Sequence, residues 1–165
     1  SLEDAIGRMA LRLSLPVGRL NSMLAPMGER LEPIAVTLEL LDALCARRDA
    51  GEPLRLYYLS NMPAPYARVL EQRHAFLRWF DGGIFSGDVR MLKPQPEIYQ
   101  LLATRHGLEA SETVFIDDSA ANVAAARALG WQAIHCEAPS ALPAQLAAYL
   151  PVRSILSTSK PSERA

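Results

Sequence analysis

The hydrophobic pattern changes its period at Gly51-Glu52-Pro53, and this change constrains the fold more than any other feature. After it, short apolar segments that are typical of strands alternate with helical patterns of about ten residues. The strands are expected at 54–59, 84–85, 113–116 and 132–136, and the helices at 65–78, 96–106, 119–129 and 140–149. This alternation predicts an α/β fold with a parallel, right-handed sheet.

The residues before Gly51 have a helical period instead. Amphipathic helices are expected at 2–15, 17–27 and 32–48. The first 30 residues do not fit the strand–helix alternation, so we expect a separate helical element at 1–30 and the α/β core at 31–150. Residues 151–165 are rich in Ser, Pro and charge, and they are expected to form a flexible tail.

Composition excludes several classes of function. The 165 residues carry a net charge of −1 and are 50% hydrophobic, which fits a globular protein and gives no electrostatic reason to bind nucleic acid. No apolar run is long enough to span a bilayer, and the acidic N-terminus lacks the basic start of a secretory signal. Cys45 and Cys136 are too few for a disulfide framework, so we expect a reducing, cytoplasmic location.

Polar residues lie at or near the carboxyl ends of three predicted strands, where open α/β sheets form their sites. They are Ser60-Asn61, Lys93 and Asp117-Asp118. Two adjacent carboxylates repel each other unless a cation relieves them, and Mg²⁺ is well suited to that. Taken alone, the acidic pair equally fits a helix N-cap beside a solvated carboxylate.

The other two segments suit an anion. Ser60-Asn61 offers a hydroxyl, an amide and backbone N–H groups, although Ser and Asn also favour ordinary turns. Lys93 precedes Pro94 and can place a positive charge on a phosphoryl oxygen, although it also fits a surface lysine. The three segments together resemble a device that stabilises charge on a transferring phosphoryl group.

The order of these motifs resembles the haloacid dehalogenase superfamily, closest to phosphatase-like members with a small helical cap. The resemblance runs from about Leu31 to Leu150 and rests on three motifs followed by Ala125-x-x-x-Leu129-Gly130-Trp131. The motifs are the strand before Ser60-Asn61, then Lys93-Pro94-x-Pro96-x-Ile98-Tyr99, then Val114-Phe115-Ile116-Asp117-Asp118-x-x-x-Asn122. It implies a three-layer, Rossmann-like parallel sheet and a partial cap at 1–30.

The resemblance implies roles for six residues. Ser60 would bind the phosphoryl group with Asn61 beside it, and Lys93 would neutralise the nucleophile and the phosphoryl charge. Asp118 would ligate Mg²⁺ and Asp117 would ligate or support it. Asn122 would help to order the site.

One family motif has no counterpart in the chain. The family's first motif is a central strand that ends in the nucleophilic Asp, and no apolar strand ending in Asp precedes Ser60. Asp4 and Asp42 have helical surroundings, and Asp49 is expected in a loop. The strands before Ser60 and Asp117 should therefore face a gap with unpaired backbone groups, each costing about 1–3 kcal/mol when buried. We expect a preceding segment or a partner chain to complete the sheet. The chain alone is expected to be unstable or to form an altered sheet, and to have little or no phosphatase activity.

The sequence is compatible with three functions. The first is a Mg²⁺-dependent phosphatase that acts on a small phosphorylated metabolite through a phospho-aspartate, the nucleophile being outside this chain. The second is a 2-haloacid dehalogenase, against which the acidic pair argues because halide displacement needs no metal. The third is a non-catalytic binding protein of the same fold.

Overall fold

The computed structural model describes residues 2–24 and 27–150, and the tail predicted at 151–165 lies outside them. The strands are β1 (Tyr57–Ser60), β2 (Gly82–Phe85), β3 (Val114–Asp117) and β4 (Gln132–His135). The α-helices are α1 (Leu2–Leu13), α2 (Val17–Leu24), α3 (Met27–Arg30), α4 (Ala35–Asp49), α5 (Ala64–Arg73), α6 (Ser86–Val89), α7 (Pro96–His106), α8 (Ala120–Ala128) and α9 (Leu142–Ala147). Short 3₁₀ helices span Ala75–Trp79, Ala110–Glu112 and Pro139–Ala141.

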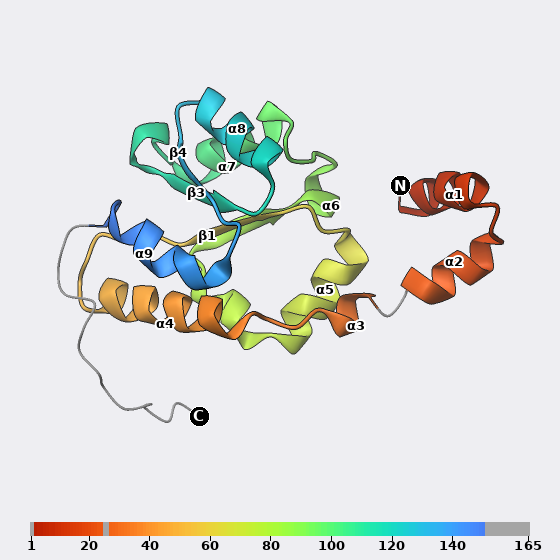
Figure 1. The fold of residues 1–165 in the computed structure, drawn as a ribbon, viewed down its shortest axis with the longest axis horizontal. Helices are drawn as coiled ribbons and strands as arrows, with labels where there is room; N and C mark the ends of the chain where they lie inside the picture. The colour runs from red at the N-terminus through yellow and green to blue at the C-terminus, as the bar shows by residue number, and fades with distance from the viewer. Residues whose placement is uncertain (1, 25–26, 151–165) are drawn as a thin grey trace.

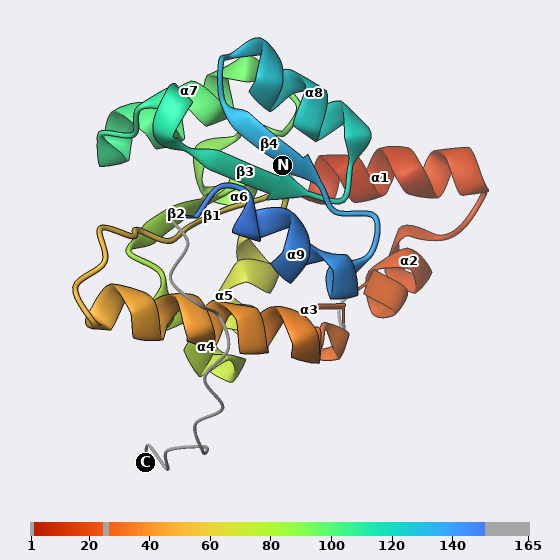
Figure 2. The ribbon, with the colours of Figure 1, turned by 60° about the vertical axis from the view of Figure 1, so that its left-hand side comes forward.

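The strands form the middle of three layers. Helices α7 and α8 cover one side of the strands, and α4, α5 and α9 cover the other (Figures 1 and 2). β1 pairs in parallel with β2, and β3 pairs in parallel with β4. The predicted α/β class with parallel strands is therefore confirmed. The strands that the structure describes are divided into two sheets of two strands each.

A groove of about 790 Å³ separates the two sheets. Its walls include Leu59 of β1, Ile116 of β3, Leu41 of α4 and Leu146 of α9. Among the described residues no strand lies in this groove, so β1 and β3 each have one edge without a strand partner. All four residues of β1 are half-buried, and Ile116 in the middle of β3 is 36% exposed. Residues of both strands line the groove, where no strand among the described residues packs beside them.

A buried aromatic cluster fixes the position of β3 against α7. Tyr99, Phe115 and Trp131 pack edge to face, with ring centroids 5.3–6.3 Å apart. Phe115 and Asp117 are the two buried residues of β3, as the two-residue period of a strand requires for side chains on the same face. The cluster therefore sets the direction in which the Asp117 carboxylate points.

The N-terminal helices use two separate contacts. α1 and α2 pack on each other through Ile6, Ala10 and Leu20. α3 packs on α5, where the Cα of Gly28 lies so close to the chain that an added Cβ would be 3.2 Å from the Cβ of Val69 and 3.3 Å from the Cα of Tyr66. The division at 1–30 stays a prediction, and the last of these helices contacts the helix that follows β1.

Several predicted boundaries were wrong for local reasons. The strand expected at 54–59 is shortened to Tyr57–Ser60, because only these residues lie opposite β2. The helix expected at 65–78 ends at Arg73, where His74 adopts an extended backbone, and a 3₁₀ turn follows. Asp49 is the last residue of α4 rather than a loop residue. None of the helices in the described part of the chain is long and apolar enough to cross a membrane.

Candidate active site

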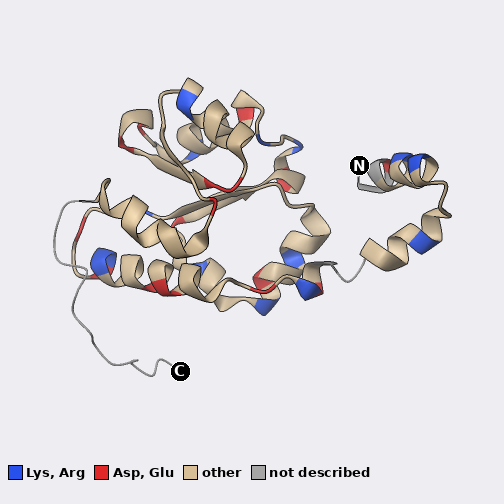
Figure 3. Cartoon of the chain, in the orientation of Figure 1, with Lys and Arg blue, Asp and Glu red and all other residues tan. Residues whose placement is uncertain are grey.

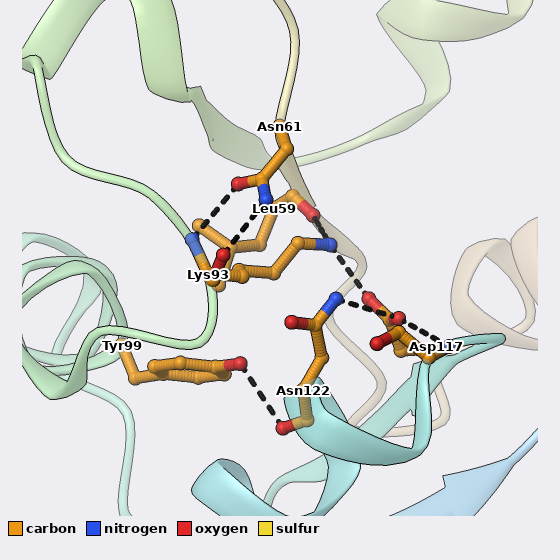
Figure 4. Close-up of polar contacts among 7 residues, drawn as sticks. Leu59, Asn61, Lys93, Tyr99, Asp117 and Asn122 are labelled. Carbon is orange, nitrogen blue, oxygen red and sulfur yellow. Dashed lines mark hydrogen bonds and ion pairs between the residues drawn. The ribbon is translucent and has the colours of Figure 1, made fainter.

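The carboxyl ends of β1 and β3 lie at the same edge of the molecule, on either side of the groove. β1 ends at Ser60 and is followed by Asn61, whereas β3 ends at Asp117. The segment between α6 and α7 brings Lys93 to the same place, although this lysine is 32 residues from Asn61 and 24 from Asp117 (Figure 4). The edge of the sheet thus collects the residues that were predicted from three separate motifs.

Lys93 connects the two sheets. Its Nζ donates one hydrogen bond to the main-chain oxygen of Leu59 in β1 and another to Oδ2 of Asp117 in β3, both at 2.6 Å (Figure 4). The side chains of Lys93 and Asp117 are only 9% and 6% exposed. These two bonds use two of the three N–H donors of the ammonium group. The third donor is the one that the lysine can offer to a ligand.

Asp117 accepts hydrogen bonds on both carboxylate oxygens. Besides the bond from Lys93 to Oδ2, its Oδ1 accepts from the backbone N–H of Ser119 and from Nδ2 of Asn122, each at 2.9 Å. Burial alone would raise the pKa of Asp117, but these bonds outweigh burial and the pKa is lowered below its ordinary 3.8. Asp117 is therefore a carboxylate at neutral pH, with its charge compensated by Lys93.

Asn122 links this carboxylate to the aromatic core. It lies in the first turn of α8 and is buried, and its main-chain oxygen accepts a hydrogen bond from the hydroxyl of Tyr99 at 3.0 Å (Figure 4). Burial, together with the negative charge of Asp117, raises the pKa of Tyr99 to about 12. The tyrosine hydroxyl therefore stays protonated and holds the start of α8 in place.

Asn61 is also engaged, but with the main chain of Lys93. Its Nδ2 donates to the Lys93 carbonyl at 2.9 Å, and its Oδ1 accepts from the Lys93 N–H at 2.8 Å (Figure 4). The oxygen of the side-chain amide and one of its two N–H groups are therefore engaged with Lys93. The predicted contact of Asn61 with a substrate stays a prediction.

Two predicted residues have groups that remain available to a ligand. In the part of the chain that the structure describes, neither the hydroxyl of Ser60 nor the carboxylate of Asp118 has a hydrogen-bond or ion-pair partner. Asp118 is exposed, and its main-chain oxygen accepts a hydrogen bond from Nε2 of His135 at 3.0 Å. Ser60 is half-buried and lies opposite Phe85 in the register of β1 and β2.

The carboxylates of this edge fit a magnesium ion as a partial ligand set. Mg²⁺ in proteins commonly takes one or two carboxylates and completes its shell with water and substrate oxygens. Asp118 directly follows Asp117, and its exposed carboxylate has no partner among the residues that the structure describes. A cluster of three or more His, Cys, Asp or Glu side chains is not formed by the described residues. The chain therefore provides two neighbouring carboxylates, of which Asp118 is the more accessible.

Sequence reasoning missed the contacts that Tyr99 and His135 make near the site. Tyr99 belongs to the Lys93-Pro94 motif, and a buried hydroxyl that requires a partner was the available signal. His135 is the register partner of Asp117 in the β3–β4 pair. Its position at a strand end was visible in the sequence, but its contact with the Asp118 carbonyl depends on the pairing of the strands.

A sequence model of the haloacid dehalogenase-like hydrolases matches residues 27–130, which is more than half of the chain. The chain belongs to this family of hydrolases. The resemblance noted from the motifs is thereby confirmed, as is the fold class that it implied. The match includes all six of the predicted site residues, from Ser60 to Asn122.

The chain is similar to several known proteins. The sesquiterpene phosphatase astK of Aspergillus oryzae is 29% identical over 133 residues, which are 81% of this chain and 65% of that protein. A family enzyme of Bacteroides thetaiotaomicron, solved with magnesium and inorganic phosphate, is 25% identical with a TM-score of 0.57, over 73% of this chain and 60% of that one. The L-2-haloacid dehalogenase of Xanthobacter autotrophicus is 24% identical with a TM-score of 0.62, over 79% and 51%.

The dehalogenase shares the fold, and the likeness carries no further than that. The chain spans between about half and two thirds of the length of each of these three proteins.

Proposed function

We propose that the chain forms the phosphoryl-binding part of a Mg²⁺-dependent phosphatase that acts on a small phosphorylated metabolite. The observation that carries this proposal is the position of Lys93, which is buried between the two sheets with one N–H donor to spare. The hydroxyl of Ser60 and the carboxylate of Asp118 lie at the same edge. A cation, a hydroxyl and a carboxylate at one sheet edge can bind an anion together with its metal ion.

The contacts of each residue support a specific role in binding the phosphoryl group. Lys93 would donate its third N–H to a phosphoryl oxygen and offset the charge that grows on it during transfer. Ser60 would donate its hydroxyl to a second oxygen. Asp118 would hold Mg²⁺ with Asp117 beside it, and the bound ion would supply positive charge to the same phosphoryl group. Asn122 would keep Asp117 in place through the bond to Oδ1.

The nucleophile of this proposal is an aspartate outside the chain. We propose that it enters on a strand, from a preceding segment or a partner chain, that fills the groove between β1 and β3. Three features support a strand. In the described part of the chain, β1 and β3 have free edges toward the groove, the residues that line the groove are largely apolar, and residues of α4 and α9 form part of its wall. A strand buried on both faces is apolar at successive positions, and one parallel to its neighbours would end at the edge where Lys93 lies.

A peptide tests the strand separately from the chemistry. The probe is a peptide of about six residues, rich in Val and Ile and ending in Asp, and its matched control has Pro at the centre, which removes a ladder hydrogen bond. We expect the first peptide to slow amide hydrogen exchange at Leu59 and Ile116, and the second to have little effect. Equal protection by both peptides, or none by either, would overturn the strand proposal.

The phosphatase proposal is tested by hydrolysis of p-nitrophenyl phosphate. The protein isolated from its natural source should release phosphate with Mg²⁺ and should stop in EDTA. Release of halide from 2-chloropropionate in EDTA, without phosphatase activity, would favour the dehalogenase instead. Binding of phosphate with Mg²⁺ but without turnover would favour the non-catalytic binding protein.

Two further proposals concern the location of the protein in the cell and its binding partners. We propose a reducing, cytoplasmic location, which is supported by the two free cysteines, Cys45 and Cys136. We also propose that neither nucleic acid nor a membrane is a partner. In support, the net charge of the sequence is −1, and Figure 3 shows both acidic and basic residues on α4 and on α5.

A further inference from the structure

The side chain of Asn61 and the main chain of Lys93 form a reciprocal pair of hydrogen bonds. Nδ2 of Asn61 donates to the Lys93 carbonyl at 2.9 Å, and the Lys93 N–H donates to Oδ1 of Asn61 at 2.8 Å (Figure 4). A side-chain amide has the carbonyl acceptor of a peptide group and two N–H donors, one of which takes the place of the peptide N–H in this pair. Asn61 therefore pairs with Lys93 as a neighbouring strand residue would, although the two lie 32 residues apart.

This pair gives Lys93 two points of attachment to the end of β1. Asn61 holds its backbone, and the Leu59 carbonyl holds its Nζ at 2.6 Å. The third attachment, the bond from Nζ to Asp117, reaches β3 on the other side of the groove. A long lysine side chain would otherwise sample many rotamers. With its backbone and its ammonium group both fixed, the remaining N–H of Nζ keeps one direction.

We propose that Asn61 is a positioning residue, which acts on a ligand through Lys93. Oδ1 and one of the two N–H groups of Nδ2 are engaged with the main chain of Lys93, so Lys93 fixes the orientation of the amide. The inference rests on the proposed function only for the role of Lys93 toward phosphate. The two hydrogen bonds between the Asn61 side chain and the Lys93 main chain, which form a clamp, are a property of the chain and are measured without a substrate.

Two substitutions separate the parts of the clamp. In Asn61→Asp, one carboxylate oxygen still accepts from the Lys93 N–H, but the other faces the Lys93 carbonyl and repels it. In Asn61→Ala, both bonds are lost. The matched control is Thr113→Val, which removes another bond from a side chain to the backbone, that from Thr113 Oγ1 to the Glu109 carbonyl at 2.7 Å. This control lies at the opposite end of β3 from Asp117.

The readout is the rate at which each lysine is acetylated, measured by peptide mass spectrometry. The sequence has two lysines, and Lys160 is an internal reference in every sample. Relative to Lys160, we expect Lys93 to react about fivefold faster in Asn61→Asp, the factor that one net hydrogen bond represents, and faster still in Asn61→Ala, where both bonds are lost. Thr113→Val should leave the ratio of the two rates unchanged, even where it lowers the melting temperature.

An unchanged ratio in the folded Asn61 variants would overturn the proposal. Should both variants fail to fold, amide hydrogen exchange of the unchanged protein decides, because the Lys93 N–H is protected only while Asn61 holds it. A Lys93 amide that exchanges as fast as those of free loop residues contradicts the clamp. Slow exchange and a raised acetylation ratio, together with an inactive protein, would support the clamp and refute the phosphatase.

Discussion

Replacing Lys93 with Met removes the ammonium group and leaves the Asp117 carboxylate buried. The exposed fraction of the Asp117 side chain is 6%, so water cannot readily take the place of the lysine. Removal of one partner of a buried ion pair costs about 3–5 kcal/mol of unfolding free energy. The bonds from Ser119 and Asn122 to Oδ1 remain in the variant. We therefore expect a cost at the lower end, about 3 kcal/mol.

The double variant Lys93→Met/Asp117→Asn shows whether this cost comes from the unpaired charge. It removes both charges and leaves an uncharged amide where the carboxylate was. We expect the double variant to lose about 1–3 kcal/mol less than the sum of the two single variants. The pKa of Asp117 should also rise in Lys93→Met, because burial is then opposed by fewer hydrogen bonds. The penalty of Lys93→Met should accordingly shrink as the pH falls and Asp117 takes up a proton.

Urea unfolding followed by tryptophan fluorescence measures these differences, since Trp131 is buried in the core beside Phe115. Arg105→Met is the matched control, because it removes an exposed cation from α7 and should change stability by no more than about 0.5 kcal/mol. A cost below about 1 kcal/mol for Lys93→Met, or strict additivity in the cycle, would refute a buried pair in solution.

Three more predictions follow from other contacts. The raised pKa of Tyr99 favours the protonated native state, so stability should fall as the pH rises from 10 to about 12, and Tyr99→Phe should remove up to about 2–3 kcal/mol of that fall in urea titrations. Gly87→Ala should cost more than about 2 kcal/mol in the same assay, because its Cβ would lie 2.2 Å from the Ala64 nitrogen. Gly7→Ala in α1, where nothing lies within 4 Å, should instead be neutral or slightly stabilising. Asp118→Asn should weaken Mg²⁺ binding about tenfold or more in calorimetry, and unchanged affinity would move the metal ligand elsewhere.

The alternation of periods was enough to predict the fold class, and the strand ends were enough to predict that Ser60, Lys93 and Asp117 lie at one edge. Both rest on local patterns: β3 runs directly into Asp117, and α7 begins at Pro96 and is followed by Gly107 with a left-handed backbone. The resemblance to the family added the expectation of a gap beside β1 and β3. The groove between the two sheets agrees with that expectation.

The partners of individual side chains could not be predicted, because they join distant segments. The clamp of Asn61 on Lys93 requires that the loop after α6 pass over the end of β1, which no local period specifies. The break at His74 was missed because apolar residues continue through Phe76 and hide the change from an α-helix to a 3₁₀ turn. The contact of His135 with the Asp118 carbonyl likewise depends on the register of β3 and β4.

We propose that this sheet edge binds the phosphoryl group of a phosphate ester together with Mg²⁺, and that the ester is hydrolysed once an aspartate enters on a strand. The most direct test is phosphate release from small phosphate esters by the protein isolated from its natural source, with Mg²⁺ and with EDTA, beside an Asp118→Asn variant expressed in the same host. We expect turnover with Mg²⁺ only, and none in the variant. Equal turnover in EDTA, or full activity of Asp118→Asn, would contradict it.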